Sequence, residues 1–289
     1  MPELPEVETT RLSLLPHLVG RRIVRVELRR TSLRTPIPGD FVARVEGATV
    51  TGIRRRAKYL LFDLNSGDVL LAHLGMSGSF RVDSSTGGEG VIPALRKHDH
   101  ILLYLEDGNR VVYHDPRRFG LVDIMRRSEE KIHKLLKGMG PEPLSEAFSE
   151  AYLKNALRAR QTPIKPLLMD QKIVVGVGNI YASESLFLAG IHPATSAGEI
   201  SGQSAAIISS IQKTLRTAIK SGGSTLRNFA QADGKSGYFQ HQFNVYNREQ
   251  LPCVVCSYPI QKIVQAGRAT YFCSQCQKQS SCQSARVKK

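Results

Sequence analysis

The first eight residues of the chain, MPELPEVE, contain groups that could act on a sugar. Once Met1 is removed, Pro2 carries a free secondary amine, which attacks an aldehyde carbon and gives a cationic iminium that draws electrons. An α-amino group titrates near about 8, so a useful fraction of it is neutral at physiological pH. Glu3 could donate a proton to a sugar ring oxygen. The same residues also suit a plain helix start, with Pro5 and Glu6 in the first turn, so this stretch alone leaves both interpretations open.

Two pairs of cysteines later in the chain have the spacing of a metal site. Cys253 and Cys256 form one CxxC pair, Cys273 and Cys276 form the second, and residues 257–272 separate the pairs. Four thiolates from two tight turns make the closed tetrahedral site of a structural zinc ion. We therefore expect one structural Zn²⁺ in a small cysteine-bounded module. Cys282 lies outside this spacing and is expected to be an idle thiol of the tail.

The composition indicates a polyanionic partner. Lys and Arg number 40 against 25 Asp and Glu in 289 residues, which gives a net charge of +15. Such an excess favours nucleic acid, ribosomal RNA or an acidic lipid face as a partner, although charge alone does not exclude a merely basic protein. No apolar run is long enough to span a bilayer, and no signal peptide is recognised. With cysteines that suit a reducing compartment, we expect a cytoplasmic protein without membrane contact.

Several residues could contact a nucleic acid, although each of them alone is also consistent with a structural role. Arg268, in QAGRATYF, lies at the expected tip of a hairpin between the cysteine pairs and suits a phosphate or a minor groove. Asn179, in GVGNIY, opens an expected helix and either caps it or marks an anion site. The segments RRRAKYLLF, AHLGMSGSF and HDPRRFGL supply five more candidates: Lys58, His73, Met76, Arg117 and Phe119.

The pattern of the chain predicts an α+β protein with two domains. A helix over residues 5–18 precedes short β-rich runs up to about residue 124, among them a hairpin that turns at Asp107-Gly108. This part is expected to be an N-terminal helix on a β-sandwich. After the Gly- and Pro-rich KGMGPEPLSE the period becomes helical, with one helix capped by Ser145 and another ending at Gly222-Gly223. The helical domain then carries the zinc β-hairpin.

Taken together, these segments resemble the bacterial-type formamidopyrimidine-DNA glycosylases, which excise oxidised purines such as 8-oxoguanine. The resemblance runs in order from the first residue to Cys276. It is carried by the stretches MPELPEVETT, RRAKYLL, HLGMSGSFR, KHDH, DPRRFG, IKPLLMDQKIVVGVGNIYASESLF, GGSTLRNF, DGKSGYF and the cysteine module.

The resemblance implies a domain plan and a partner. The catalytic helix and β-sandwich would occupy residues 1–130, a linker 131–147, a helix-two-turn-helix domain with a loop over the lesion 148–235, the zinc finger 236–277 and a tail 278–289. The partner would be double-stranded DNA that contains oxidised purines, and we expect a monomer.

The resemblance also implies roles for individual residues. Pro2 would attack C1′ of the damaged nucleotide, Glu3 would move protons, and Glu6 would hold the terminus in place. Strand cleavage by β,δ-elimination would follow, with no catalytic metal or redox cofactor. Lys58, counted with the catalytic group, would bind phosphates together with His73, Asn179 and Arg268. The residues that would enter the duplex or face the lesion are Met76, Arg117, Phe119 and Lys165, with Arg117 opposite the orphaned cytosine.

Three features depart from the family pattern. The loop over residues 84–95 is longer than usual, the tail after Cys276 is extended, and Asn228 stands where an aspartate is common. The loop and the tail touch none of the motifs that carry the expected activity, whereas Asn228 lies within GGSTLRNF and bears on the loop expected over the lesion.

Three other interpretations remain open. A non-catalytic zinc-ribbon protein that binds DNA or RNA would explain the charge and the cysteines, but not the Pro2-Glu3 start. The endonuclease VIII-like branch would prefer oxidised pyrimidines; the PELPE start together with Met76, Arg117 and Phe119 favours the purine branch. A metal-dependent hydrolase built on KHDH and His73 lacks a convincing set of ligands.

Overall fold

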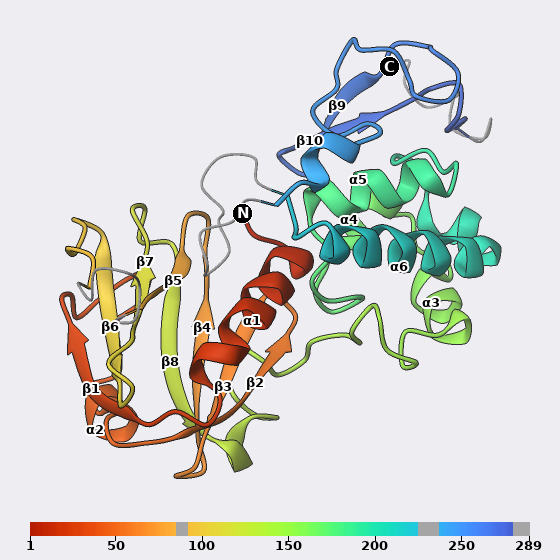
Figure 1. Ribbon diagram of the computed structural model, residues 1–289. Coiled ribbons are helices and arrows are strands. Elements are labelled where there is room, and N and C mark those ends of the chain that lie inside the picture. Colours follow the sequence, from red (N-terminus) through yellow and green to blue (C-terminus); the bar gives the residue numbers. More distant parts are fainter. Residues whose placement is uncertain (85–91, 225–236, 280–289) are drawn as a thin grey trace. The chain divides into compact units, whose positions relative to one another are not determined.

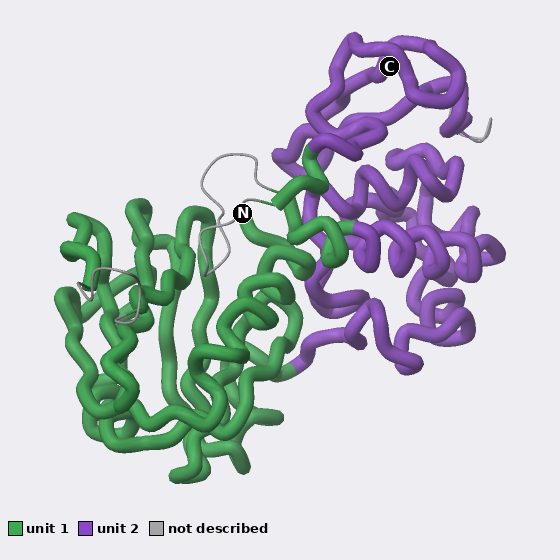
Figure 2. Tube along the Cα trace, in the orientation of Figure 1, with its two compact units in different colours: residues 1–137, 218–240 green, residues 138–217, 241–289 purple. Residues whose placement is uncertain are grey.

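The computed structural model describes residues 1–84, 92–224 and 237–279. Most of the loop expected over the lesion, including Asn228, lies outside the described residues, as do part of the 84–95 loop and Cys282. The chain divides into two compact units (Figure 2). Unit 1 contains residues 1–137 and 218–240, and unit 2 contains residues 138–217 and 241–289. The stretch 218–240 thus groups with the N-terminal part of the chain.

Unit 1 is a β-sandwich with a helix along it, as the sequence predicted. Helix α1 (Leu4–Leu18) packs beside β2 and β3 (Figure 1). In the described residues, one antiparallel sheet has the order β1-β6-β7-β5 and the other β2-β3-β4-β8. The strands of the first sheet are β1 (Ile23–Leu28), β6 (Asp99–Leu105), β7 (Arg110–His114) and β5 (Ser79–Asp83), and those of the second are β2 (Val50–Arg56), β3 (Tyr59–Leu64), β4 (Asp68–His73) and β8 (Leu121–Arg126). The short α2 (Phe41–Val45) and a 3-10 turn (Arg127–Glu129) also belong to this unit.

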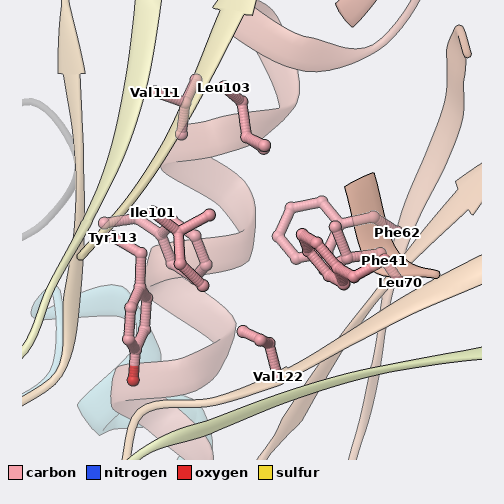
Figure 3. A pocket seen from close by; sticks show the side chains of 9 residues that line it. Phe41, Phe62, Leu70, Ile101, Leu103, Val111, Tyr113 and Val122 are labelled. Atoms are coloured by element: carbon pink, nitrogen blue, oxygen red, sulfur yellow. The ribbon is translucent and has the colours of Figure 1, made fainter. Parts of the chain in front are cut away.

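The core of unit 1 fills the space between the two sheets. The rings of Phe62 and Phe80 meet edge to face with centroids 5.7 Å apart, and Phe80 meets Tyr113 in the same way at 5.1 Å. These residues line a small apolar hollow between the sheets (Figure 3). Val7 and Leu14 of α1 belong to the same buried cluster. Apolar side chains from both inner faces and one helix face therefore form one core.

The strand register gathers three turns at one end of the second sheet. Arg56 pairs with Tyr59, Tyr59 pairs with His73, and His73 pairs with Leu121. The turn between β2 and β3, the segment after β4 and the segment before β8 therefore all lie at that end of the sheet. The predicted hairpin at Asp107-Gly108 is also confirmed, since β6 pairs with β7 and Gly108 adopts a φ of +82° in the turn.

Unit 2 is helical and carries a two-stranded ribbon. Its helices are α3 (Glu150–Leu157), α4 (Ile164–Leu168), α5 (Asn179–Leu188) and α6 (Ser204–Lys220), and its 3-10 turns are Ala197–Gln203 and Phe239–Gln242. The last turn of α6 belongs to unit 1, and the turn at Phe239–Gln242 crosses the boundary between the units. Strands β9 (Gln261–Gln265) and β10 (Arg268–Phe272) form the ribbon, and β10 packs against α5. Among the described residues, no helix is both long and apolar enough to cross a membrane.

One helix cap differs from the prediction. Helix α3 begins after Ser149, whose hydroxyl accepts the Tyr152 N–H, and not after Ser145. The Ser145 hydroxyl donates instead to the Glu142 carbonyl in the preceding turn. Phe148 is buried beside the Tyr152 ring, and this packing sets where the chain enters the helix.

Candidate functional site

The head of α1 is anchored by the Glu6 carboxylate. Its Oε2 accepts the Glu3 N–H at 2.8 Å, and its Oε1 accepts both the N–H and the hydroxyl of Ser224 at 2.8 and 3.0 Å. Pro2, Glu3 and Glu6 are all buried, whereas Met1 is 49% exposed. The arrangement fixes the backbone of Glu3 and so the place where the chain starts. Ser224 had no signal in the sequence, because it contacts Glu6 across 218 positions.

A glycine is required beside this anchor. Gly223 has a φ of +79°, a region that side chains rarely adopt, and a Cβ there would lie 3.2 Å from Glu6 Cγ. The Gly222-Gly223 stop that the sequence indicated is confirmed, since α6 ends at Lys220. Its second glycine also lets the chain pass close to Glu6.

Glu8 ties α1 to strand β2. Its carboxylate accepts from Arg11 at 2.6 Å and from Arg55 at 2.9 Å. Burial raises the pKa of Glu8, but the two guanidinium groups outweigh burial, so the net pKa is lowered. The ionised network fixes the helix against the strand that leads to Lys58.

Lys58 and His73 lie at the end of the second sheet where the turns gather. Lys58 is largely buried and follows Ala57, which has a φ of +55° in the turn between β2 and β3. His73 Nδ1 accepts the Gly75 N–H at 2.9 Å, so Nε2 carries the proton of the neutral ring. Burial, together with the charges of Lys58 and Arg34, lowers the pKa of His73 to about 4. The ring is therefore a neutral donor at physiological pH.

Three side chains project from two neighbouring loops at the same end of the sheet. Met76 is 42% exposed and Phe119 is 46% exposed, so both apolar side chains face solvent beside the Arg117 guanidinium. The Arg117 guanidinium carbon lies 4.7 Å from the centre of the Phe119 ring. A Cβ on Gly75 would lie 2.3 Å from the Phe119 backbone, so the two loops touch directly. The sequence placed these residues in turns, and the structure brings the turns together.

In unit 2, Lys165 is buried and joins three elements. Its ammonium donates to Asn179 Oδ1 at 2.5 Å and to Thr270 Oγ1 at 2.7 Å, with Ala269 O at 3.5 Å. Asn179 Nδ2 donates to the same carbonyl at 2.9 Å. Asn179 thus does not cap α5 through its side chain, because Gly178 occupies the cap position and the amide bonds to the ribbon. Thr270 also gave no signal in the sequence.

Arg268 is exposed at the start of β10, directly after the turn at Ala266 and Gly267. It pairs with Gln265 across the ribbon, so it lies at the hairpin tip that the sequence predicted. The backbone of the next residue, Ala269, accepts the bonds from Asn179 and Lys165. The candidate contacts of unit 2 are therefore fixed to one another.

The four cysteines fit a zinc ion. A tetrahedral site with zinc–sulfur bonds of about 2.3 Å separates its sulfurs by about 3.8 Å. Cys253 and Cys276 place their Sγ atoms 3.8 Å apart, Cys256 and Cys273 place theirs 3.4 Å apart, and all four lie within 4.8 Å of one another. Within the described residues this is the only such group of His, Cys, Asp or Glu. The part of the chain that the structure describes thus holds no ligand cluster for a hydrolase built on KHDH.

Two buried carboxylates hold segments that lie far from them in the sequence, and sequence reasoning did not find either. Glu184 on α5 accepts four bonds of 2.8–3.0 Å, from the backbone N–H groups of Asn244, Val245 and Tyr246 and from the Asn244 amide. Asp115 accepts from Ser77 and Gly120. Both make contacts with residues distant in the sequence, so no local pattern marks either of them.

Comparison with known proteins identifies the family. Three family models match in order: the formamidopyrimidine-DNA glycosylase N-terminal domain over residues 1–122, the formamidopyrimidine-DNA glycosylase H2TH domain over 139–230 and a zinc finger found in FPG and IleRS over 250–279. The chain belongs to the formamidopyrimidine-DNA glycosylase family. It is 48% identical over 283 residues to the formamidopyrimidine-DNA glycosylase of Roseobacter denitrificans, a match that covers 96% of this chain and all of that protein. The relative from Rhodopseudomonas palustris is 48% identical over 291 residues, with the same coverage.

Solved structures of formamidopyrimidine-DNA glycosylases have the same fold. The MutM (Fpg) protein of Thermus thermophilus matches with a TM-score of 0.84 at 39% identity. The Lactococcus lactis Fpg bound to DNA with an abasic site matches at 0.86 and 35%, and a mutant of it bound to Fapy-dG DNA matches at 0.87 and 35%. Each match covers 96% of this chain and all of the other. The predicted family, fold class and structural zinc are thereby confirmed, while the roles of individual site residues stay predictions.

Proposed function

We propose that this chain excises oxidised purines from duplex DNA through a Schiff base on Pro2 and then cuts the strand by β,δ-elimination. As a member of its family it is a DNA glycosylase and AP lyase of base excision repair. The observation that carries the finer proposal is the anchored head of α1, where Glu6 fixes the backbone of Glu3 beside Pro2. The Lactococcus lactis relatives, which bind Fapy-dG and abasic-site DNA, support the substrate class.

The chemistry follows from a proline at the start of the chain. After Met1 is removed, the Pro2 nitrogen is a free amine and forms a bond to C1′ while the damaged base leaves. Glu3 gives a proton to the ring oxygen, and the sugar opens to a cationic iminium. The iminium acidifies the C2′ proton, whose loss expels the 3′ phosphate. A second elimination expels the 5′ phosphate.

The exposed groups of unit 1 suit the extrusion of a base. A base inside a duplex has to leave the stack before an enzyme can reach its sugar, at a cost of a few kcal/mol. Met76 and Phe119 are apolar wedges that fill the gap, and Arg117 offers hydrogen bonds to the orphaned base. Lys58 and the neutral His73 donate to phosphates at the same end of the sheet.

Unit 2 supplies further phosphate contacts. Asn179 and Arg268 are fixed to each other through Ala269, and the zinc ion holds the ribbon that carries Arg268. Lys165 supports them from inside the unit. Together with the net charge of +15, these phosphate contacts give affinity that does not depend on sequence. We place the activity of the protein in the cytoplasm, on the nucleoid, and propose that it acts as a monomer.

Borohydride trapping tests this proposal. The protein is incubated with a duplex that holds 8-oxoguanine opposite cytosine, sodium borohydride reduces any iminium, and peptide mass mapping locates the adduct. We expect an adduct on Pro2, none with an undamaged duplex, and none from a variant that keeps one extra residue before Pro2. If protein whose N-terminus is Pro2 binds the duplex without an adduct, the non-catalytic zinc-ribbon interpretation replaces this one. A second duplex with an oxidised pyrimidine separates the two substrate branches.

A further inference from the structure

The carboxylate of Asp115 joins the two loops that carry the exposed side chains of unit 1. Asp115 is completely buried, at 0% exposure, directly after β7. Its Oδ1 accepts the Ser77 hydroxyl at 2.6 Å, and its Oδ2 accepts the Gly120 N–H at 2.8 Å. Ser77 follows Met76, and Gly120 follows Phe119. One carboxylate is therefore bonded to the neighbour of each apolar wedge.

Further hydrogen bonds hold the same two loops. The Ser77 hydroxyl oxygen accepts the Arg117 N–H at 3.2 Å, so the third exposed residue is held as well. The Tyr113 hydroxyl donates to the His73 carbonyl at 3.1 Å. Burial, with the charge of Asp115, raises the pKa of Tyr113 well above its ordinary value, so the hydroxyl keeps its proton. A Cβ on Gly120 would lie 1.8 Å from this hydroxyl, so only glycine fits there.

Asp115 itself is held by its backbone. Its N–H donates to the His98 carbonyl at 3.0 Å, and its carbonyl lies 2.9 Å from His100 Nε2 and accepts the Arg118 N–H at 3.3 Å. Arg118 has a φ of +56°, which turns the chain so that Arg117 and Phe119 project outward. The carboxylate thus has a fixed position from which to hold both loops.

We propose that Asp115 is a positioning residue that keeps Met76, Arg117 and Phe119 in the geometry of one preformed wedge. The inference rests on the proposed function, because a wedge matters only to an enzyme that extrudes a base. Because the loops of a preformed wedge are already ordered, DNA binding does not carry the entropic cost of ordering them. Asp115 does not touch the DNA; it acts through the loops. Its loss should therefore slow base extrusion and leave the chemistry on the sugar intact.

A substrate without a base separates these steps. On a duplex with 8-oxoguanine, excision requires extrusion, whereas on a duplex with a preformed abasic site no base has to leave the stack. Asp115→Ala removes both bonds and should lower the single-turnover excision rate about 10- to 100-fold, since each bond to a charged group contributes substantially. The rate of cleavage at the abasic site should stay within about 3-fold of wild type.

Two further variants make the test specific. Asp115→Asn keeps an oxygen for the Gly120 N–H and offers an N–H to the Ser77 oxygen, so it should recover part of the excision rate. Asp68→Asn is the matched control: Asp68 is also buried, at 3% exposure, but it lies at the other end of β4, where it pairs with Arg44 and Arg126. It should change both rates by the same small factor. A 2-aminopurine next to the lesion reports the insertion step directly by fluorescence.

The outcomes are distinguishable. If wild-type protein cleaves neither duplex, the proposed function is wrong, and this result does not depend on any Asp115 variant. If wild type cleaves both and Asp115→Ala loses both rates equally, or loses neither, Asp115 is not a positioning residue of the wedge. If Asp115→Ala loses excision alone, with a slower 2-aminopurine signal and partial rescue by asparagine, the inference holds.

Discussion

The hydrogen bond between the buried Lys165 ammonium and Thr270 allows a quantitative prediction. Thr270→Val keeps the shape of the side chain but removes the oxygen that accepts from Lys165 Nζ at 2.7 Å. Thr270 is completely buried, so water does not replace the lost acceptor. A hydrogen bond to a charged group contributes about 1.5–3 kcal/mol. We therefore expect the ribbon to lose about 2 kcal/mol of local stability against opening.

The partner variant tests the cause. Lys165→Met keeps most of the stem and removes the charge that needs the acceptor. In that background the Thr270 oxygen has only a long contact of 3.5 Å to the Arg268 carbonyl. Thr270→Val should then cost less than about 0.5 kcal/mol, so the two substitutions are strongly coupled.

Hydrogen exchange read by mass spectrometry measures this locally. Peptides that cover β9 and β10 report the opening of the ribbon in the full zinc-loaded chain. A loss of about 2 kcal/mol corresponds to exchange about 30-fold faster in Thr270→Val. Peptides from unit 1 serve as the internal control and should not change. If Thr270→Val accelerates exchange equally with and without Lys165, the bond to the ammonium is not what stabilises the ribbon.

Three other predictions follow from the same contacts. Because the pKa of His73 is lowered to about 4, the unfolded chain takes up a proton below about pH 6.5 that the folded chain does not. Between pH 7 and 5.5 the free energy of unfolding should therefore fall by about 1 kcal/mol more in wild type than in His73→Gln. If urea titrations give the same pH dependence for both proteins, this prediction is wrong. Cys256→Ser should lower the zinc content in native mass spectrometry and speed exchange in β9 and β10, while exchange in the sandwich stays unchanged. Glu6→Gln keeps one oxygen but turns an amide N–H toward the donor of either Glu3 or Ser224, and it should cost about 1–3 kcal/mol in urea titrations. An unchanged midpoint would show that the anchor is not stabilising.

Features that depend on neighbours in the sequence were predictable. The zinc ligands are two CxxC pairs, and the hairpin at Asp107-Gly108 is fixed by its own turn, so spacing alone identifies both. The N-terminal helix follows from its start at Pro5 and Glu6, and the strands follow from short β-rich runs. The β-sandwich follows in turn, because such sheets have to bury their apolar faces against one another.

Features that depend on register were not predictable from the pattern. Asp115 meets Ser77 across 38 positions, and Lys165 meets Thr270 across 105. Such pairs exist only once the strands and helices are packed, and nothing local marks their members. Asn179 shows the same limit, because its amide could satisfy a helix cap or a distant carbonyl, and only the packed ribbon decides between them.

The gathering of the turns that carry Lys58, Met76 and Phe119 at one end of the second sheet leaves its other end available for attachment. There the exposed turn at Asn65, Ser66 and Gly67 joins β3 to β4, a full strand length from His73. Because side chains alternate along a strand, one residue inserted within β4 would turn His73 to the opposite face, whereas residues added in this turn leave the pairing intact. Ser66 is therefore the position at which to couple a fluorophore or a surface tether. Single molecules labelled there could be followed along DNA with the end that carries Met76, Arg117 and Phe119 unobstructed.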